Sequence, residues 1–160
     1  MKGDREIIKL LNTVLTNELT SVNQYFLHAR MIDNWGFKRL GKIVYDESIE
    51  EMKHADTLIK RVLFLDGLPN LQDLHKLALG ESVTEALSAD LALETAGQAT
   101  LIPGIAQCEK AQDYVSREIL VRILEDTEDH IDFLETQLSL IRSLGEQNYL
   151  QSALGDLSES

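Results

Sequence analysis

The sequence predicts an all-α fold in which four long helices form a bundle, with one long crossover and a short fifth helix at the C-terminal end. Apolar residues recur at helical spacing in four long segments, and the 160 residues include only two prolines. Leucine, glutamate, alanine and isoleucine dominate, and strand signals are poor. The segment that joins the second and third helical stretches is too long and too apolar for a turn between adjacent helices.

The first predicted helix covers residues 4–34, with Asp4 as its N-cap. Its apolar stripe is interrupted by Glu18 and Tyr25, which occupy the same face as the leucines around them. A lone glutamate in such a stripe normally marks the boundary of a buried surface. Residues 35–36 (Trp-Gly) supply the turn into the next helix.

The second predicted helix covers residues 38–65 and carries a Glu-x-x-His motif on the face that should be apolar. Glu51 and His54 are the two residues of this motif. A carboxylate and an imidazole buried without partners would destabilise the fold by several kcal/mol, so they must be paired or must bind a cation. Taken alone, such a pair is more often a solvated hydrogen bond between successive turns than half of a metal site.

A second apolar row runs along the same helix, rotated by about 100° from the first. It consists of Tyr45, Ile49, Met52, Ile59 and Leu63. A helix with two such rows buries one inside its own bundle and offers the other to a partner. Met52 lies at the centre of the row, where a methionine without further context would be a residue that fills a gap at an interface.

Residues 68–80 are expected to form an ordered crossover between helices that run parallel. The third predicted helix begins near Ser82, and Glu94 occupies the middle of its apolar stripe. Glu94 is thus a third carboxylate on a face that should be buried. Pro103 lies inside this helix, and the sequence leaves open whether it kinks the helix or ends it.

The fourth predicted helix covers residues 113–143, and its buried stripe carries His130 near mid-length. Residues 148–153 are expected to form the short fifth helix. We expect residues 1–154 to form one domain and residues 155–160 to be a disordered tail.

Composition excludes several classes of function. The formal net charge of −12 argues against nucleic-acid binding, and although an acidic surface suits cations, plain solubility explains the same charge at least as well. The single cysteine, Cys108, excludes an internal disulfide and is interpreted as a small core residue in a reducing compartment. No segment has the features of a signal peptide or a membrane span, so we expect a cytoplasmic protein with neither nucleic acid nor membrane as a partner.

Polar residues on the buried faces of all four helices together predict a metal site. They are Glu18, Glu51, His54, Glu94 and His130. Independent accidents of this kind on four helices would be rare, so a shared ligand is the better explanation. Bundles that bind two irons use one glutamate from each of two helices and a Glu-x-x-His from each of the other two. These ligand types suit iron or manganese, with zinc as a common competitor.

Long blocks of the sequence also match a known family. They are MKGD at the start, NQYFLHARM at 23–31, ESIEEMKHAD at 47–56, RVLFLDGLPNLQDL at 61–74, DYVSRE at 113–118, HIDFLETQLSLI at 130–141 and NYLQS at 148–152. In these blocks the chain resembles the bacterioferritins over essentially its whole length. The resemblance implies a ferritin-like bundle that assembles from twofold dimers into a hollow shell of twenty-four subunits. It also implies that O2 oxidises Fe(II) at an intrasubunit di-iron site and that ferric mineral is stored in the shell.

The resemblance implies roles for further residues. Met52 matches the family's haem ligand, so that one methionine from each subunit of a dimer would hold a b-type haem (protoporphyrin IX). Tyr25 matches a tyrosine beside the di-iron site, where it would be an electron donor or simply a packed core residue. Position 46 is often a histidine that binds iron on the inner surface; here it is Asp46, with Glu50 one turn further, and both remain able to bind iron. A ferredoxin-type reductant would release the stored iron.

One position departs from the family pattern. Relatives carry a bridging glutamate three residues before the last histidine, and this sequence has Thr127 there. A threonine hydroxyl is neutral and short, so it cannot bridge two cations, and Asp126 and Glu128 point about 100° away around the helix. We therefore expect a weakened ferroxidase centre, in which the iron contacted by Glu94 and His130 is the more affected.

Two functional interpretations follow. The chain is either an oxidising and storing subunit that tolerates Thr127, or a low-activity, haem-bearing shell subunit that assembles with a second, complete subunit into a heteropolymer. A small di-iron oxygenase unrelated to storage fits less well, because it would not explain the whole-length resemblance or the apolar row around Met52.

Overall fold

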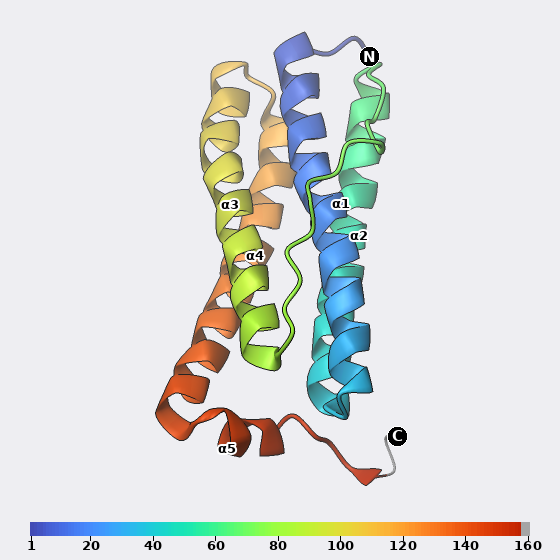
Figure 1. Cartoon of the computed structure of the whole chain (residues 1–160). Coiled ribbons are helices and arrows are strands. Elements are labelled where there is room, and N and C mark those ends of the chain that lie inside the picture. The colour runs from blue at the N-terminus through green and yellow to red at the C-terminus, as the bar shows by residue number, and fades with distance from the viewer. Residues whose placement is uncertain (158–160) are drawn as a thin grey trace.

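The structure is a computed structural model that describes residues 1–157. Four long helices form a bundle, and a short fifth helix lies across one end of it (Figure 1). The helices are α1 (Arg5–Asn34), α2 (Lys38–Phe64), α3 (Val83–Lys110), α4 (Tyr114–Leu144) and α5 (Glu146–Gln151). The predicted all-α bundle with a short fifth helix is confirmed. Part of the expected disordered tail, residues 158–160, lies outside the described residues.

Caps and turn residues explain where the helices begin and end. The Asp4 carboxylate accepts hydrogen bonds from two backbone N–H groups of the first turn of α1, as predicted. Ser82 caps α3 in the same way, because its hydroxyl oxygen accepts from a first-turn N–H at 3.2 Å. Gly145 ends α4 with a φ of 81°, in the region that favours glycine. The next helix, α5, starts directly after this glycine, two residues earlier than predicted.

Pro103 lies inside α3, and the helix continues past it to Lys110. Of the two outcomes that the sequence left open, termination at the proline is therefore excluded. The proline removes one backbone N–H from the helical ladder, but both flanking halves pack in the bundle and hold the helix together.

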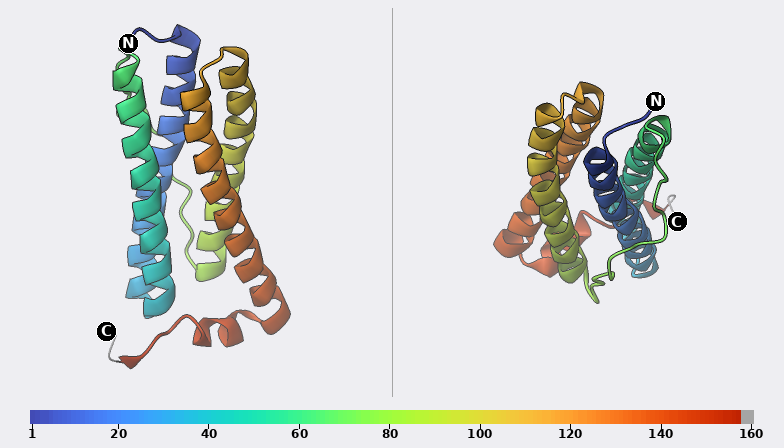
Figure 2. Two further views of the ribbon diagram at one scale, coloured as in Figure 1. Left: turned by 180° about the vertical axis from the view of Figure 1, so that it is seen from behind. Right: turned by 90° about the horizontal axis from the view of Figure 1, so that it is seen from above.

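The crossover between α2 and α3, residues 65–82, is an ordered segment that runs along the bundle and is called the strap below. Figures 1 and 2 show that α2 and α3 run parallel and that the crossover returns along α1 over most of the bundle's length. Side chains of α1 hold it by accepting hydrogen bonds from its backbone N–H groups. These contacts are Asn12 to Asn70 (2.9 Å), Thr20 to His75 (3.0 Å), Gln24 to Ala78 (3.0 Å) and His28 to Gly80 (3.0 Å). The prediction of an ordered crossover between parallel helices is confirmed.

His28 and Asp90 form a buried pair where this strap reaches α3. Nδ1 of His28 lies 2.7 Å from Oδ1 of Asp90, and both residues are at most 1% exposed. Because Nε2 of His28 accepts the Gly80 N–H, the ring proton lies on Nδ1 and is donated to Asp90. The pair therefore ties α1, α3 and the end of the crossover together.

Two separate apolar clusters fill the two ends of the bundle. One contains the second half of α1 and the start of α2, and the other contains the first half of α1 and the end of α2, together with Cys108. Buried polar side chains occupy the level between the clusters. No helix within residues 1–157 has an apolar stretch long enough to cross a membrane.

Candidate metal centre

The five predicted ligands converge at this middle level of the bundle. Each residue is between 4% and 8% exposed, and each comes from the helix expected to supply it. The residues are Glu18 on α1, Glu51 and His54 on α2, Glu94 on α3 and His130 on α4. Helical periodicity places them on inward faces because each occupies a position that an apolar residue would otherwise fill.

Glu18, Glu51 and His54 form one group of metal-ligand atoms. Nδ1 of His54 lies 3.4 Å from a carboxylate oxygen of Glu18 and 3.4 Å from one of Glu51. One ligand atom from each residue lies within 4.8 Å of the others. A single cation placed among them would contact all three residues.

A second group shares Glu51 with the first. It consists of Glu47, Glu51 and His130, whose ligand atoms also lie within 4.8 Å of one another. Nδ1 of His130 is 3.0 Å from Oε1 of Glu94, so the carboxylate of Glu94 reaches the same imidazole from α3. Two groups of donors joined by one glutamate match the chemistry of a pair of cations bridged by a carboxylate.

Burial and neighbouring charges shift the pKa values of Glu51, Glu94 and His54 in the absence of a cation. Burial and the charge of Glu18 raise the pKa of Glu51 to about 8. Burial also raises the pKa of Glu94 to about 7, although the hydrogen bond with His130 acts in the opposite direction. Burial disfavours the charged form of His54, but its contacts with Glu18 and Glu51 outweigh this effect and raise its pKa to about 11. The site therefore holds protons that a divalent cation would replace.

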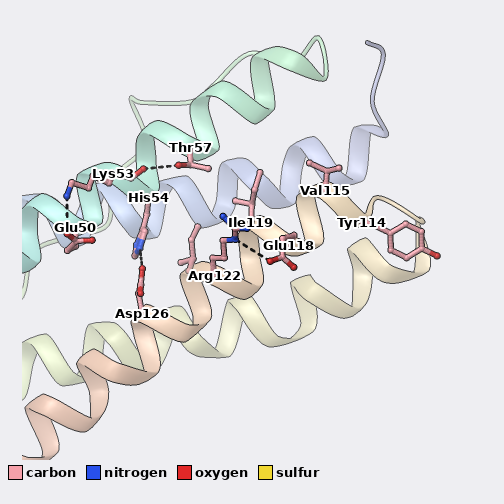
Figure 3. Close-up of a pocket in the computed structure, with 11 residues that line it drawn as sticks. Glu50, Lys53, His54, Thr57, Tyr114, Val115, Glu118, Ile119, Arg122 and Asp126 are labelled. Carbon is pink, nitrogen blue, oxygen red and sulfur yellow. Dashed lines mark hydrogen bonds and ion pairs between the residues drawn. The ribbon is translucent and has the colours of Figure 1, made fainter.

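Asp126 of α4 fixes the orientation of His54. Nε2 of His54 lies 2.7 Å from Oδ2 of Asp126, and Figure 3 shows the two side chains pointing toward each other between α2 and α4. With Nε2–H donated to Asp126, Nδ1 of the protonated ring faces Glu18 and Glu51, and loss of its proton would leave a lone pair directed at a cation placed among them. The sequence predicted no such role for Asp126. This role could have been anticipated because a metal-binding histidine needs a hydrogen-bond acceptor for its other ring nitrogen.

Thr127 does not contribute to either group of ligands. It is 3% exposed, and its hydroxyl donates a hydrogen bond to the Ile123 carbonyl of its own helix at 2.8 Å. The side chain is thus satisfied within α4 and presents no negative charge to a cation.

Tyr25 contacts the second group from α1. It is fully buried, its hydroxyl donates a short hydrogen bond to Glu94, and its ring packs edge-on against His130 with centroids 5.3 Å apart. Burial and the charge of Glu94 raise the pKa of Tyr25 well above its usual value, so the phenol keeps its proton.

Asp46 and Glu50 lie apart from the buried ligands. The exposed carboxylate of Asp46 pairs with Lys42 at 2.9 Å, and that of Glu50 pairs with Lys53 at 3.1 Å. Within residues 1–157 neither belongs to a close group of three metal-ligand residues. Glu50 lines the mouth of the site, whereas Asp46 does not.

A cleft between α2 and α4 leads to the ligands. A pocket of about 230 Å³ is lined by Glu47, Glu50, Glu51, His54, Asp126, Asp129 and His130. A neighbouring pocket of about 580 Å³, shown in Figure 3, shares Glu50, His54 and Asp126 with it. The cleft therefore presents an acidic path from the surface to the buried site.

Met52 lies on the other side of α2, and 50% of its surface is exposed in the single chain. It lines a shallow pocket of about 450 Å³ together with Leu19, Ile49, Ala55, Ile59 and Leu71, and with the polar residues Lys53 and Asp56. A thioether in such surroundings is free to meet a ligand or a second subunit.

The site also includes one further carboxylate on α2. This residue is Glu47, which the sequence did not predict as a ligand. The sequence feature that could have indicated this role is its position one turn before Glu51 on the same helix face, since two carboxylates at this spacing can reach one cation.

The chain is similar to known proteins over most of its length. A model of the ferritin-like domain family matches residues 8–144. The bacterioferritin of Mycobacterium leprae is 48% identical over 149 residues, covering 93% of this chain and 94% of the relative. The bacterioferritin of Brucella melitensis is 47% identical over 161 aligned positions, covering 99% of this chain and all of the relative. A bacterial ferritin of Pseudomonas aeruginosa is 48% identical over 157 residues, covering 96% of this chain and all of the relative.

Proposed function

Because the chain belongs to the bacterioferritin family, we propose that it is an iron-storage subunit that oxidises Fe(II) with O2 at the site between its four helices. The product, Fe(III), is deposited as mineral inside a hollow shell of such subunits. The proposal rests on two groups of ligand residues that share Glu51, one with Glu18 and His54 and the other with Glu47 and His130. Both groups lie between the two apolar clusters, at the middle of the bundle.

The residues of the site divide into two sets around Glu51. Glu18 and His54 serve one Fe(II), and His130 and Glu94 serve the other. Two bound Fe(II) give two electrons to one O2, which takes up two protons and leaves as H2O2. Asp126 holds the His54 ring so that Nδ1 faces its ion, and Glu51 and Glu94, whose pKa values are raised, give up protons as the substrate binds.

Haem b at a twofold dimer interface is the second part of the proposal. Met52 supplies the thioether ligand, and the apolar residues around it supply the surface on which the porphyrin rests. Half of the Met52 side chain is exposed, as expected for a residue whose partner is another molecule. A ferredoxin-type reductant would deliver electrons for iron release through this haem, and the shell would reside in the cytoplasm.

Thr127 supports a second candidate function. A subunit without the bridging carboxylate would oxidise iron slowly and would contribute haem and storage volume to a shell that also contains a complete subunit. The mass of shells isolated from native cells distinguishes the two assemblies, since a single subunit mass indicates a homopolymer and two masses indicate a heteropolymer.

Stopped-flow oxidation of Fe(II) by the purified protein tests the proposed activity. We expect a rapid phase that saturates near two Fe(II) per subunit. Absence of a rapid phase in the wild type, with recovery only in Thr127→Glu, would support the low-activity subunit. Absence in both proteins would contradict the ferroxidase proposal itself.

A further inference from the structure

The ligand set predicted from sequence is short of negative charge. Ionised Glu18, Glu51 and Glu94 carry three negative charges, whereas two divalent cations carry four positive charges. Uncompensated charge inside a protein is strongly unfavourable, so a buried pair of cations requires a further carboxylate. Thr127 does not supply it, since its hydroxyl bonds to its own helix.

We propose that Glu47 is the fourth carboxylate ligand of the site and takes over the charge that position 127 lacks. The inference rests on the proposed function and assigns the second metal ion to Glu47, Glu51 and His130. The ligand reaches the ion from α2, the helix that already carries Glu51 and His54, and not from α4.

Glu47 makes different contacts from those of the two carboxylates near it on the helix surface, Asp46 and Glu50. One of its oxygens lies within 4.8 Å of ligand atoms of Glu51 and His130, and its Oε2 is 3.7 Å from Nδ1 of His130. That imidazole is its only ion-pair partner in the described part of the chain. Asp46 and Glu50, by contrast, are each neutralised by a lysine on the helix surface.

The position of Glu47 also fits a ligand at the mouth of the site. Its side chain is 32% exposed, and it lines the acidic pocket that opens between α2 and α4. Partial burial raises the pKa of Glu47, as full burial does for Glu51 and Glu94. The residue lies one turn before Glu51, so both carboxylates project from one face of α2 toward the same cavity.

A double-mutant cycle tests the assignment with Co(II) as the probe under anaerobic conditions. Binding is followed by calorimetry and by the visible absorption of the bound ion, so iron oxidation is not the readout. The proteins are the wild type, Glu47→Gln, Thr127→Glu and the double variant. The matched control is Glu128→Gln, which makes the same chemical change at an exposed position beside Thr127.

We expect the wild type to bind two Co(II) per subunit and Glu47→Gln to weaken one of them by about tenfold or more. The control should bind like the wild type. In the Thr127→Glu background, the effect of Glu47→Gln should shrink to less than about threefold, because the new glutamate supplies the missing charge.

Equal binding by Glu47→Gln and the control would overturn the assignment while leaving the proposed function intact. Failure of the wild type to bind Co(II) at all would instead overturn the proposed function. Shell assembly and the far-ultraviolet circular dichroism of each variant identify any loss of folding, and the Thr127→Glu pair keeps the test valid if Glu47→Gln alone assembles poorly.

Discussion

His54 and Asp126 lie on facing helices, and Nε2 of the imidazole is 2.7 Å from Oδ2 of the carboxylate. This contact orients the ring so that Nδ1 faces the carboxylates of Glu18 and Glu51, and it keeps a proton on Nε2 when Nδ1 binds a cation. It links α2 to α4 at a point where a cleft otherwise separates the two helices. The contact therefore has a role in both the site and the packing of the bundle.

Replacing Asp126 with alanine should weaken the metal ion held by His54 by about 10- to 100-fold, since the imidazole loses the acceptor that orients it. Asp126→Asn should retain most of the affinity, because its amide oxygen still accepts the Nε2–H hydrogen bond. Co(II) titration measures both variants. The side chain of Asp126 is 54% exposed, so the fold should remain intact. Equal affinity in the wild type and the alanine variant would show that the contact does not orient a ligand.

Metal binding should release protons near neutral pH. The pKa values of Glu51 (about 8) and His54 (about 11) are raised, so both groups are largely protonated at pH 7 in the metal-free protein. Cation binding requires the deprotonated forms, and the apparent affinity should therefore increase as the pH rises from about 6 to 8. Calorimetry in buffers of different ionisation enthalpy counts the protons. An enthalpy that does not depend on the buffer would contradict the raised pKa values.

The same shifts make the metal-free protein less stable at high pH. A group with a raised pKa in the folded state stabilises the fold fully below its unfolded pKa and loses that contribution as the pH rises through the folded value. For Glu51 the loss falls between its usual value of 4.5 and about 8. Thermal unfolding of the metal-free protein should show a falling Tm over this range, and Glu51→Gln should flatten the slope. A slope unchanged in the variant would exclude Glu51 as its source.

Met52→Leu should abolish the Soret absorption of haem in the purified protein while leaving the shell assembled. Leucine keeps the apolar volume of the residue but has no sulfur ligand, so packing and ligation are separated. The absorption spectrum and the elution volume of the shell are the two measurements. A Soret band that survives the substitution would count against ligation by Met52.

His28→Ala should destabilise the subunit by about 1–3 kcal/mol, because the buried Asp90 carboxylate keeps only its hydrogen bond from Gln24. It also removes the acceptor that holds the Gly80 N–H at the end of the crossover. The effect should appear in chemical denaturation, and Co(II) stoichiometry should stay at the wild-type value. A loss below about 1 kcal/mol would mean that Gln24, which also donates to Asp90, is sufficient.

Much of the fold follows from periodicity and caps in single segments. The buried residues of α4 are those of its apolar stripe, with Thr127 and His130 included, since a long helix with one apolar face can pack in only one way. The inward direction of Glu18, Glu51 and Glu94 follows from the same rule. The start of α5 differed by two residues because Gly145 both ends one helix and begins the next.

Contacts between helices could not be predicted in this way. Asp126 reaches His54, and Glu47 reaches His130, only because α2 and α4 have a particular spacing and relative height in the bundle. Helical periodicity predicts which face of its helix a residue occupies, but it does not predict which residue of another helix lies opposite. The pairing of His28 with Asp90 was unpredictable for the same reason.

A crystal structure of the protein soaked anaerobically in Co(II), with anomalous scattering data, tests the central claim most directly. Two anomalous peaks should lie between the four helices, one among Glu18, Glu51 and His54 and the other beside Glu51 and His130, with Glu47 as a ligand of the second. A map without peaks at this level, or with these side chains turned away from the bound ions, would contradict the di-metal site.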